Sequence, residues 1–188
     1  MVGLHKKMAK IVLIGTSHKY QTGGDKAEAI EQFRHLLISL CSEHGATAIA
    51  EEMNQAALAE GDASESIACV VAAKLKLEHQ LSDPLPEVRE QLGIRAENDI
   101  QLQGFCSNWT TEQIKAEVRK SYEIREKYWL NQLRILNSWP LLFVCGANHI
   151  EPFSALLRSN GFEVIVPFAD WEPNPPFHRT CAKSSTGQ

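Results

Sequence analysis

The feature that most constrains the fold is a regular alternation of short apolar runs with longer stretches of helical periodicity. Short, mainly apolar runs predict strands at 9–14, 47–50, 141–145 and 162–166, and a further strand is predicted at 78–83, before Asp83-Pro84. Periodic stretches between them predict helices at 25–45, 54–76 (interrupted at 61–64), 87–92, 110–136 and 151–159. Successive strands joined through helices need crossover connections. The pattern therefore predicts a three-layer α/β fold, with a mainly parallel sheet and helices on both faces.

Size and composition narrow the class further. A chain of 188 residues predicts one domain, which we place at residues 1–171. The last part, 172–188, is rich in Pro, Ser and Lys and is predicted to be a flexible tail. The net charge of -4 argues against a nucleic-acid partner. Five cysteines without a CxxC pair and no long apolar run predict reduced thiols in a cytoplasmic protein that does not enter a membrane.

Polar side chains follow four of the predicted strands. Ligands of an open parallel sheet bind beyond the carboxyl ends of its strands. Any one of these residues has an ordinary capping role as an alternative, but their coincidence at one edge predicts a site. The strand-end residues are Ser17 and His18, Glu51 and Glu52, Asp83, and Asn148 and His149.

The long helix at 110–136 places an arginine within an apolar stripe. Arg125 lies between Tyr122 and Trp129 on this stripe. A guanidinium there must reach solvent or find an anionic partner. One interpretation is a structural ion pair with a strand-end carboxylate; the other is a group that binds an anionic substrate or holds a catalytic carboxylate. Glu126, at the edge of the stripe, also has access to the predicted site.

Other motifs point to no further chemistry. The segment GTSHKYQTGGDK lacks the glycine and lysine spacing of nucleotide-binding loops. The absence of GxSxG argues against a serine hydrolase of the α/β type. Four further histidines have no strand-end placement and are interpreted as incidental: His5, His35, His44 and His79.

Taken together, these residues resemble the TraB/Tiki superfamily. The resemblance rests on GTSH at 15–18, Glu51 or Glu52, the SDP segment at 82–84, Arg125-Glu126, and GANH at 146–149. That superfamily includes metal-dependent hydrolases, peptidases among them, with ChaN-like haem-binding and erythromycin-esterase-like relatives. The resemblance implies functional roles for His18, one of the two glutamates, Arg125 and His149. The usual Arg-Asn pair reads Arg125-Glu126 here, which is a departure from the family pattern.

Two imidazoles and a carboxylate suit Zn, Mn or Co, and the resemblance therefore predicts a divalent metal held by His18, Glu51 and His149. We favour Glu51 over Glu52 as the ligand because it directly follows the apolar run, and strand side chains alternate between faces. The function expected is hydrolysis of a peptide, ester or related small substrate by a metal-activated water. Catalytic roles fall to Glu52, Asp83, Arg125 and Glu126, and substrate binding to Ser17, Tyr20 and Asn148.

Two other functions use the same residues. A non-catalytic protein would bind haem, through His18 and Tyr20, or an anion in the same cleft. In a structural module the polar strand ends would serve only as caps. A site of either binding class requires His18, His149 and one glutamate to share a cleft, within about 8 Å of one another. It also requires Arg125 to be mostly buried and paired.

Overall fold

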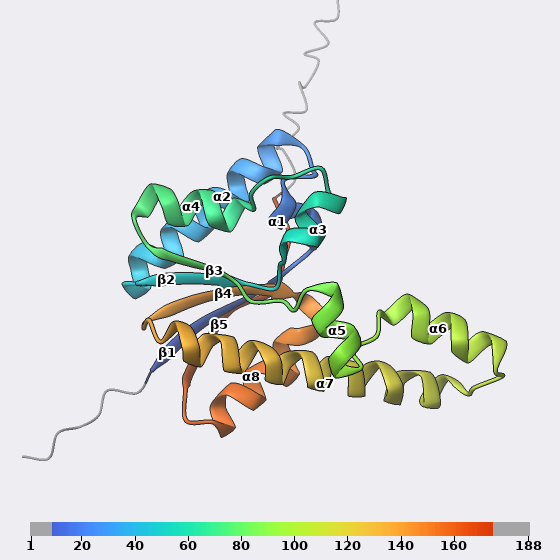
Figure 1. Ribbon diagram of the computed structural model, residues 1–188. Coiled ribbons are helices and arrows are strands. Elements are labelled where there is room, and N and C mark those ends of the chain that lie inside the picture. The colour runs from blue at the N-terminus through green and yellow to red at the C-terminus, as the bar shows by residue number, and fades with distance from the viewer. Residues whose placement is uncertain (1–8, 175–188) are drawn as a thin grey trace, which may run out of the picture.

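The computed structural model describes residues 9–174. Its five strands form one sheet in the order β3-β2-β4-β1-β5 (Figure 1). All four strand pairings are parallel, which confirms the predicted α/β fold. The strands are β1 (Lys10–Thr16), β2 (Ala48–Glu51), β3 (Glu78–Leu81), β4 (Leu141–Gly146) and β5 (Glu163–Trp171).

Helices connect successive strands and cover the sheet. On the N-terminal side of the chain they are α1 (His18–Thr22), α2 (Ala27–His44), α3 (Gln55–Glu60) and α4 (Ile67–Leu75). The later ones are α5 (Pro86–Leu92), α6 (Glu97–Cys106), α7 (Thr111–Leu136), the 3-10 turn η1 (Ala147–His149) and α8 (Ile150–Ser159).

The sheet separates two hydrophobic cores, because alternate side chains of each strand point to opposite faces. Val12 and Ile49 belong to the core under α2 and α4. Leu13 and Ala50 belong to the core under α7 and α8. The sheet and the helices on its two faces therefore form three layers. The face on which a side chain lies determines which helices it can contact at the strand ends.

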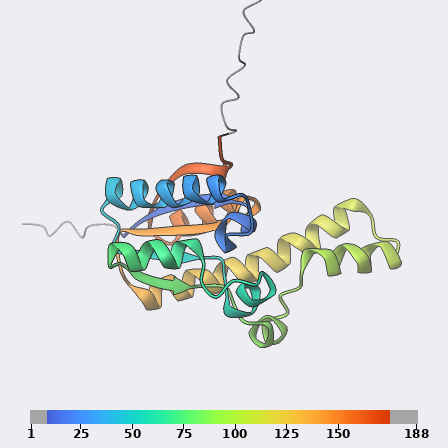
Figure 2. The ribbon, with the colours of Figure 1, turned by 90° about the horizontal axis from the view of Figure 1, so that it is seen from above.

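Helix α7 has the sequence features of a strong helix, and it reaches beyond the sheet. Thr110 is its N-cap and forms a capping box with Gln113. The C-terminal half of α7 buries Trp129 and Leu133 against the sheet. The N-terminal half runs out from the body and pairs with α6 (Figures 1 and 2). The site-forming residues of α7 lie between these two halves.

Several boundaries differ from the prediction. The stretch 54–76 forms two helices, capped by the side chains of Asn54 and Ser66. The stretch 84–109, where one helix was predicted, contains both α5 and α6. Strand β5 runs to Trp171, five residues beyond its predicted end, because it pairs with β1 through two register shifts. Sequence periodicity alone carries no signal for such pairing.

The predicted start of the flexible tail does not coincide with the end of packing. The Tyr20 hydroxyl donates to the Glu172 carboxylate, and the Asn174 N–H donates to the Gln32 side chain. These contacts hold Glu172 and Asn174 against α1 and α2. Residues 175–188 of the predicted tail lie outside the described residues.

The described part of the chain contains no helix long and apolar enough to cross a membrane. Its four cysteines form no disulfide among themselves, and Cys181 lies outside the described residues. The cytoplasmic location stays a prediction.

Candidate functional site

A polar cavity of about 300 Å³ opens at the carboxyl ends of β1, β2 and β4. His18 enters it at the start of α1, directly after β1. Glu52 enters from the residue after β2, and His149 from the turn after β4. Tyr122 and Arg125 of α7 complete the wall. The prediction that both histidines and one glutamate share a cleft is therefore confirmed.

Glu52 is the centre of this cluster. Its Oε1 lies 3.5 Å from His18 Nε2, 3.6 Å from His149 Nε2 and 2.7 Å from Arg125 Nη1. Its Oε2 accepts the backbone N–H of Gly146 at 2.6 Å. Burial by itself would raise the pKa of this carboxyl, but the nearby Arg125 guanidinium and His18 imidazole outweigh it and lower the pKa well below the usual range. Glu52 is therefore a fixed negative charge at neutral pH.

Glu51, the favoured metal ligand, lies on the opposite face, and that prediction is wrong about where its side chain goes. Its Oε1 accepts the Ser66 hydroxyl and lies 2.7 Å from His79 Nε2. Glu51 shares a face with Ile49, under α4, whereas Glu52 shares a face with Ala50, under α7. The pleat separates the two glutamates, and only Glu52 meets the histidines.

Arg125 is buried and paired as predicted. Its Nη1 contacts Glu52, and its Nε donates to Asp83 Oδ1 at 2.5 Å. The side chain is only 14% exposed. Both carboxylates raise the pKa of Arg125 above its usual value, against the opposing effect of burial. The guanidinium is therefore committed to two protein carboxylates.

Asp83, predicted to be catalytic, accepts several hydrogen bonds and lines the neighbouring cavity of about 570 Å³. Trp129 Nε1 also donates to its Oδ1, at 3.1 Å, while Asn54 Nδ2 and the Arg89 guanidinium donate to Oδ2. Four donors, counting Arg125, thus occupy its two oxygens. Asp83 is also not among the residues that line the 300 Å³ cavity. Its structural effect is to fix Arg125 beneath Glu52.

His149 is held by Glu126 of α7, which was predicted to be catalytic. The side chain is buried, and its Nδ1 lies 2.9 Å from Glu126 Oε1. Glu126 Oε2 in turn accepts Arg119 Nη2 at 3.0 Å. The rings of Tyr122 and Trp129 pack on the imidazole, with centroids at 4.2 and 4.7 Å. A carboxylate only accepts hydrogen bonds, so Nδ1 carries a proton toward Glu126, while Nε2 lies 3.6 Å from Glu52 Oε1.

His18 is the exposed member of the site, with 53% of its side chain accessible. Its placement depends on the glycine before it: a Cβ at Gly15 would lie 1.9 Å from the Ala169 carbonyl oxygen. Only glycine lets β1 and β5 approach here. The interaction with Glu52 raises the pKa of His18, although burial opposes it. The protonated, cationic form of His18 is therefore favoured.

The predicted substrate-binding residues divide into two groups. Ser17 and Asn148 line the cavity. Tyr20 does not, because its ring is buried against Phe33 and Trp171 in the core under α2. The pairing of His18 with Tyr20 as haem ligands therefore has no structural support.

Sequence reasoning missed three contributors to the site or its surroundings. Tyr122 appeared only as part of the apolar stripe, although its spacing from Glu126 (i, i+4) places both on the His149 side of α7. Asp170 lines the cavity from the unpredicted end of β5. His79 was set aside as incidental but is the partner of Glu51.

The residues present do not fit the predicted metal centre. The spacings of Glu52 from the two histidines are those of neighbouring ligands around one ion, but the same Glu52 oxygen is already paired with Arg125. Within residues 9–174, no group of three or more His, Cys, Asp or Glu side chains could hold a metal ion. We therefore assign no metal to this site.

Comparisons with family models, with curated proteins and with solved structures each found no match. The TraB/Tiki resemblance therefore stays a prediction that rests on the motifs alone.

Proposed function

We propose that this protein hydrolyses an ester, peptide or related small acyl substrate at the strand-end cavity. The observation that carries the proposal is the pair formed by His149 and Glu126: a buried imidazole that lines the cavity, oriented at Nδ1 by a buried carboxylate, with Nε2 3.6 Å from Glu52 Oε1. In this arrangement the imidazole is the general base and the carboxylate fixes its orientation.

Water is the nucleophile in this proposal. His149 Nε2 takes a proton from a water molecule while the water oxygen attacks the carbonyl carbon of the substrate. Glu126 stabilises the imidazolium that forms, and Arg119 holds Glu126 in position by donating to its other oxygen. The C=O electron pair moves to the carbonyl oxygen, which becomes an oxyanion.

His18 is the group that meets this oxyanion. Its raised pKa favours the protonated imidazole, which donates a hydrogen bond to developing negative charge. Glu52 maintains that protonation, and Arg125 keeps Glu52 ionised. When the tetrahedral intermediate collapses, the His149 imidazolium returns its proton to the departing alcohol or amine. The products are a carboxylic acid and that leaving group.

The alternative of an anion-binding protein has one supporting observation, the exposed His18 imidazole, whose pKa is raised by Glu52. Arg125 contributes little to it, since Glu52 and Asp83 already neutralise its charge. An anion such as phosphate would then bind weakly, and no substrate would be turned over.

A variant series separates the two functions. Hydrolysis of 4-nitrophenyl acetate, followed by absorbance, is expected for the wild type and is expected to fall about 100-fold or more in His149→Gln and in Glu126→Gln. The matched control, His79→Gln, removes an imidazole that pairs with a glutamate outside the cavity, and should retain activity. Equal activity in all four proteins would refute the proposal, whereas phosphate binding without hydrolysis would favour the anion-binding alternative.

The same assay tests the metal directly. Activity is expected to be unchanged after dialysis against EDTA and after addition of Zn²⁺ or Mn²⁺. Loss on chelation, with recovery on one of these ions, would show that the predicted metal centre exists after all.

A further inference from the structure

The strand-end cavity of about 300 Å³ continues into two larger cavities. A cavity of about 570 Å³ shares His18, Glu52, Tyr122 and Arg125 with the 300 Å³ cavity. It shares a further set of lining residues with a third cavity of about 520 Å³, which lies between α3, α5 and the α5–α6 connection. Those residues are Ala57, Glu60, Arg89, Ile94, Arg95 and Ala96. The three spaces form one groove that leads away from His149.

The outer cavity of 520 Å³ has an apolar floor. Ala57 of α3, Pro86 of α5 and Ile94 after α5 line it together with Ala56. The wall near Ile94 is fixed in place, because the Arg95 backbone N–H donates to the Ser121 hydroxyl and Ser121 donates back to the Arg95 carbonyl. A groove of this kind suits the methylene groups of an extended chain.

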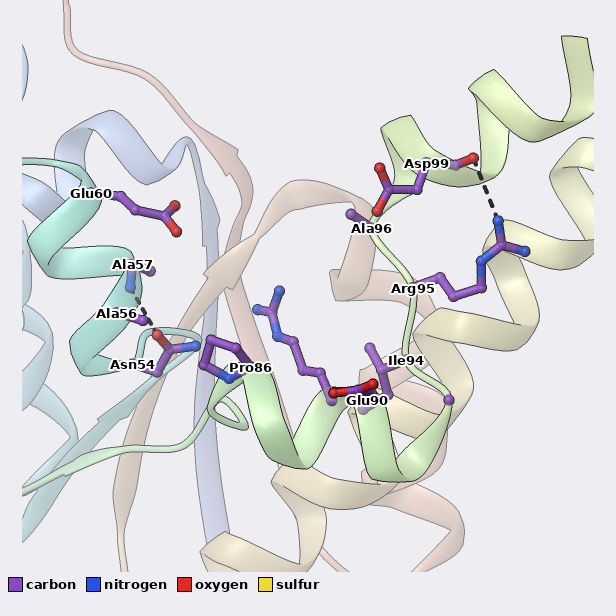
Figure 3. Close-up of a pocket in the computed structure, with 12 residues that line it drawn as sticks. Asn54, Ala56, Ala57, Glu60, Pro86, Glu90, Ile94, Arg95, Ala96 and Asp99 are labelled. Atoms are coloured by element: carbon purple, nitrogen blue, oxygen red, sulfur yellow. Dashed lines mark hydrogen bonds between the residues drawn. The ribbon is translucent and has the colours of Figure 1, made fainter. Parts of the chain in front are cut away.

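Carboxylates stand over that floor from separate elements. Figure 3 shows Glu60 of α3 and Asp99 of α6 projecting toward the outer cavity from opposite walls, with Glu90 of α5 below. Among residues 9–174, the ion pairs involve none of these three. The lining of the outer cavity thus has three carboxylates and two arginines, so its net charge is negative.

The two arginines of this cavity offset only part of the charge of its three carboxylates. Arg89 pairs with Asp83, whose one negative charge it shares with Arg125. Arg95 turns to the backbone carbonyl of Asp99, at 3.4 Å, on the side away from Glu60 (Figure 3). An anionic ligand would meet repulsion from the three carboxylates, whereas a cation would meet attraction.

We propose that the outer cavity is a second binding subsite of the cleft, which holds the cationic end of an extended substrate. The alkyl stem lies on Ala57, Pro86 and Ile94, and an ammonium or guanidinium head lies between Glu60 and Asp99. This subsite rests on the proposed hydrolase function for its role in turnover, but its geometry is independent of the chemistry at His149. The substrate class is an acyl compound that carries a basic group several bonds from the scissile carbonyl.

The test compares two 4-nitrophenyl esters of equal size, 6-guanidinohexanoate and the neutral 6-ureidohexanoate, with the acetate ester as a substrate too short to reach the subsite. For the wild type, kcat/KM is expected to be about tenfold higher for the guanidino ester, roughly the effect of one charge-assisted hydrogen bond. Glu60→Gln and Asp99→Asn should each lower that ratio about threefold or more. Neither should change acetate hydrolysis.

Two further variants make the result specific. Ala57→Phe fills the floor shared by both outer cavities and should abolish the guanidino preference while leaving acetate hydrolysis intact. Glu43→Gln removes an exposed carboxylate at the far end of α2 and should alter neither ratio. Hydrolysis of the acetate with no guanidino preference would overturn the subsite and leave the hydrolase standing.

A binding measurement keeps the subsite testable if no ester is hydrolysed. Calorimetric titration with 6-guanidinohexanamide should show binding to the wild type that weakens in Glu60→Gln, in Asp99→Asn and at high salt. Binding without hydrolysis would refute the proposed function and support the subsite as a ligand site. Absence of binding, or equal binding to the charge variants, would overturn the subsite.

Discussion

Glu51 and Glu52 are adjacent in sequence and both fully buried, yet they belong to two different kinds of polar cluster. Glu51 pairs with Ser66 and His79 on the α4 side of the sheet. Glu52 meets two histidines and Arg125 on the α7 side, where the cluster opens into a groove. Each glutamate has a histidine partner, so a carboxylate–imidazole pair by itself does not mark a site.

What distinguishes the two clusters is the cavity and the number of charges that converge on it. The Glu51 cluster is closed by α4, and none of its members lines the groove described above. The Glu52 cluster combines a fixed carboxylate, a guanidinium, an exposed His18 whose pKa is raised, and the separately oriented His149. The following changes test whether this distinction holds, from the largest expected effect to the smallest.

The first comparison replaces one histidine of each cluster by glutamine. His149→Gln is expected to lower kcat/KM for 4-nitrophenyl acetate about 10²- to 10⁴-fold, because it removes the general base. His79→Gln should leave this rate unchanged, since His79 faces the other side of the sheet. Comparable losses in both variants would mean that the two clusters act as one unit.

The second concerns the ion-pair network beneath the cavity. Arg125→Met leaves Glu52 and Asp83 buried without their guanidinium, and should lower the free energy of unfolding by roughly 3–5 kcal/mol. Arg134→Met, at an exposed position on the same helix, serves as the control. Urea unfolding monitored by circular dichroism measures both. An Arg125→Met protein as stable as the wild type would show that the network contributes no net stability.

The third comparison replaces each of the two glutamates by glutamine. Glu51→Gln should lower stability by about 1–3 kcal/mol, the effect of disturbing buried hydrogen bonds, while ester hydrolysis persists. Glu52→Gln should instead reduce hydrolysis, because His18 loses the carboxylate that keeps it protonated. The reverse pattern, with activity lost only in Glu51→Gln, would reassign the site to the α4 side.

The smallest expected effect is on the pH dependence of stability. The pKa of His18 is raised in the folded state, so its proton binds more tightly there than in the unfolded chain. The resulting stabilisation is fully present below about pH 6.5, the unfolded pKa. It is lost as pH rises through the folded pKa. The difference in unfolding free energy between wild type and His18→Gln should therefore shrink on going from pH 6 to pH 9, and a constant difference would contradict this assignment.

Much of this architecture follows from sequence pattern. Apolar runs at 9–14 and 141–145 are long enough to specify buried strands, and their continuity indicates a sheet covered on both faces. Arg125 within an apolar stripe must reach solvent or find an anionic partner, and Asp83 and Glu52 are its partners. The strand-end positions of His18 and His149 place both at one edge, because parallel strands all end on the same side.

Other features were decided only by tertiary structure. The alternation of strand side chains separates Glu51 from Glu52, but which face carries α7, and hence Arg125 and Glu126, depends on how the helices pack. Periodicity likewise gave no sign of the extension of β5 to Trp171 or of the burial of Tyr20 against it, since both arise from contacts between distant segments. The sequence thus determines which groups reach the edge of the sheet, because local periodicity sets strand ends. The choice of partners at that edge is a property of the assembled layers, because only packing brings α7 and β2 together.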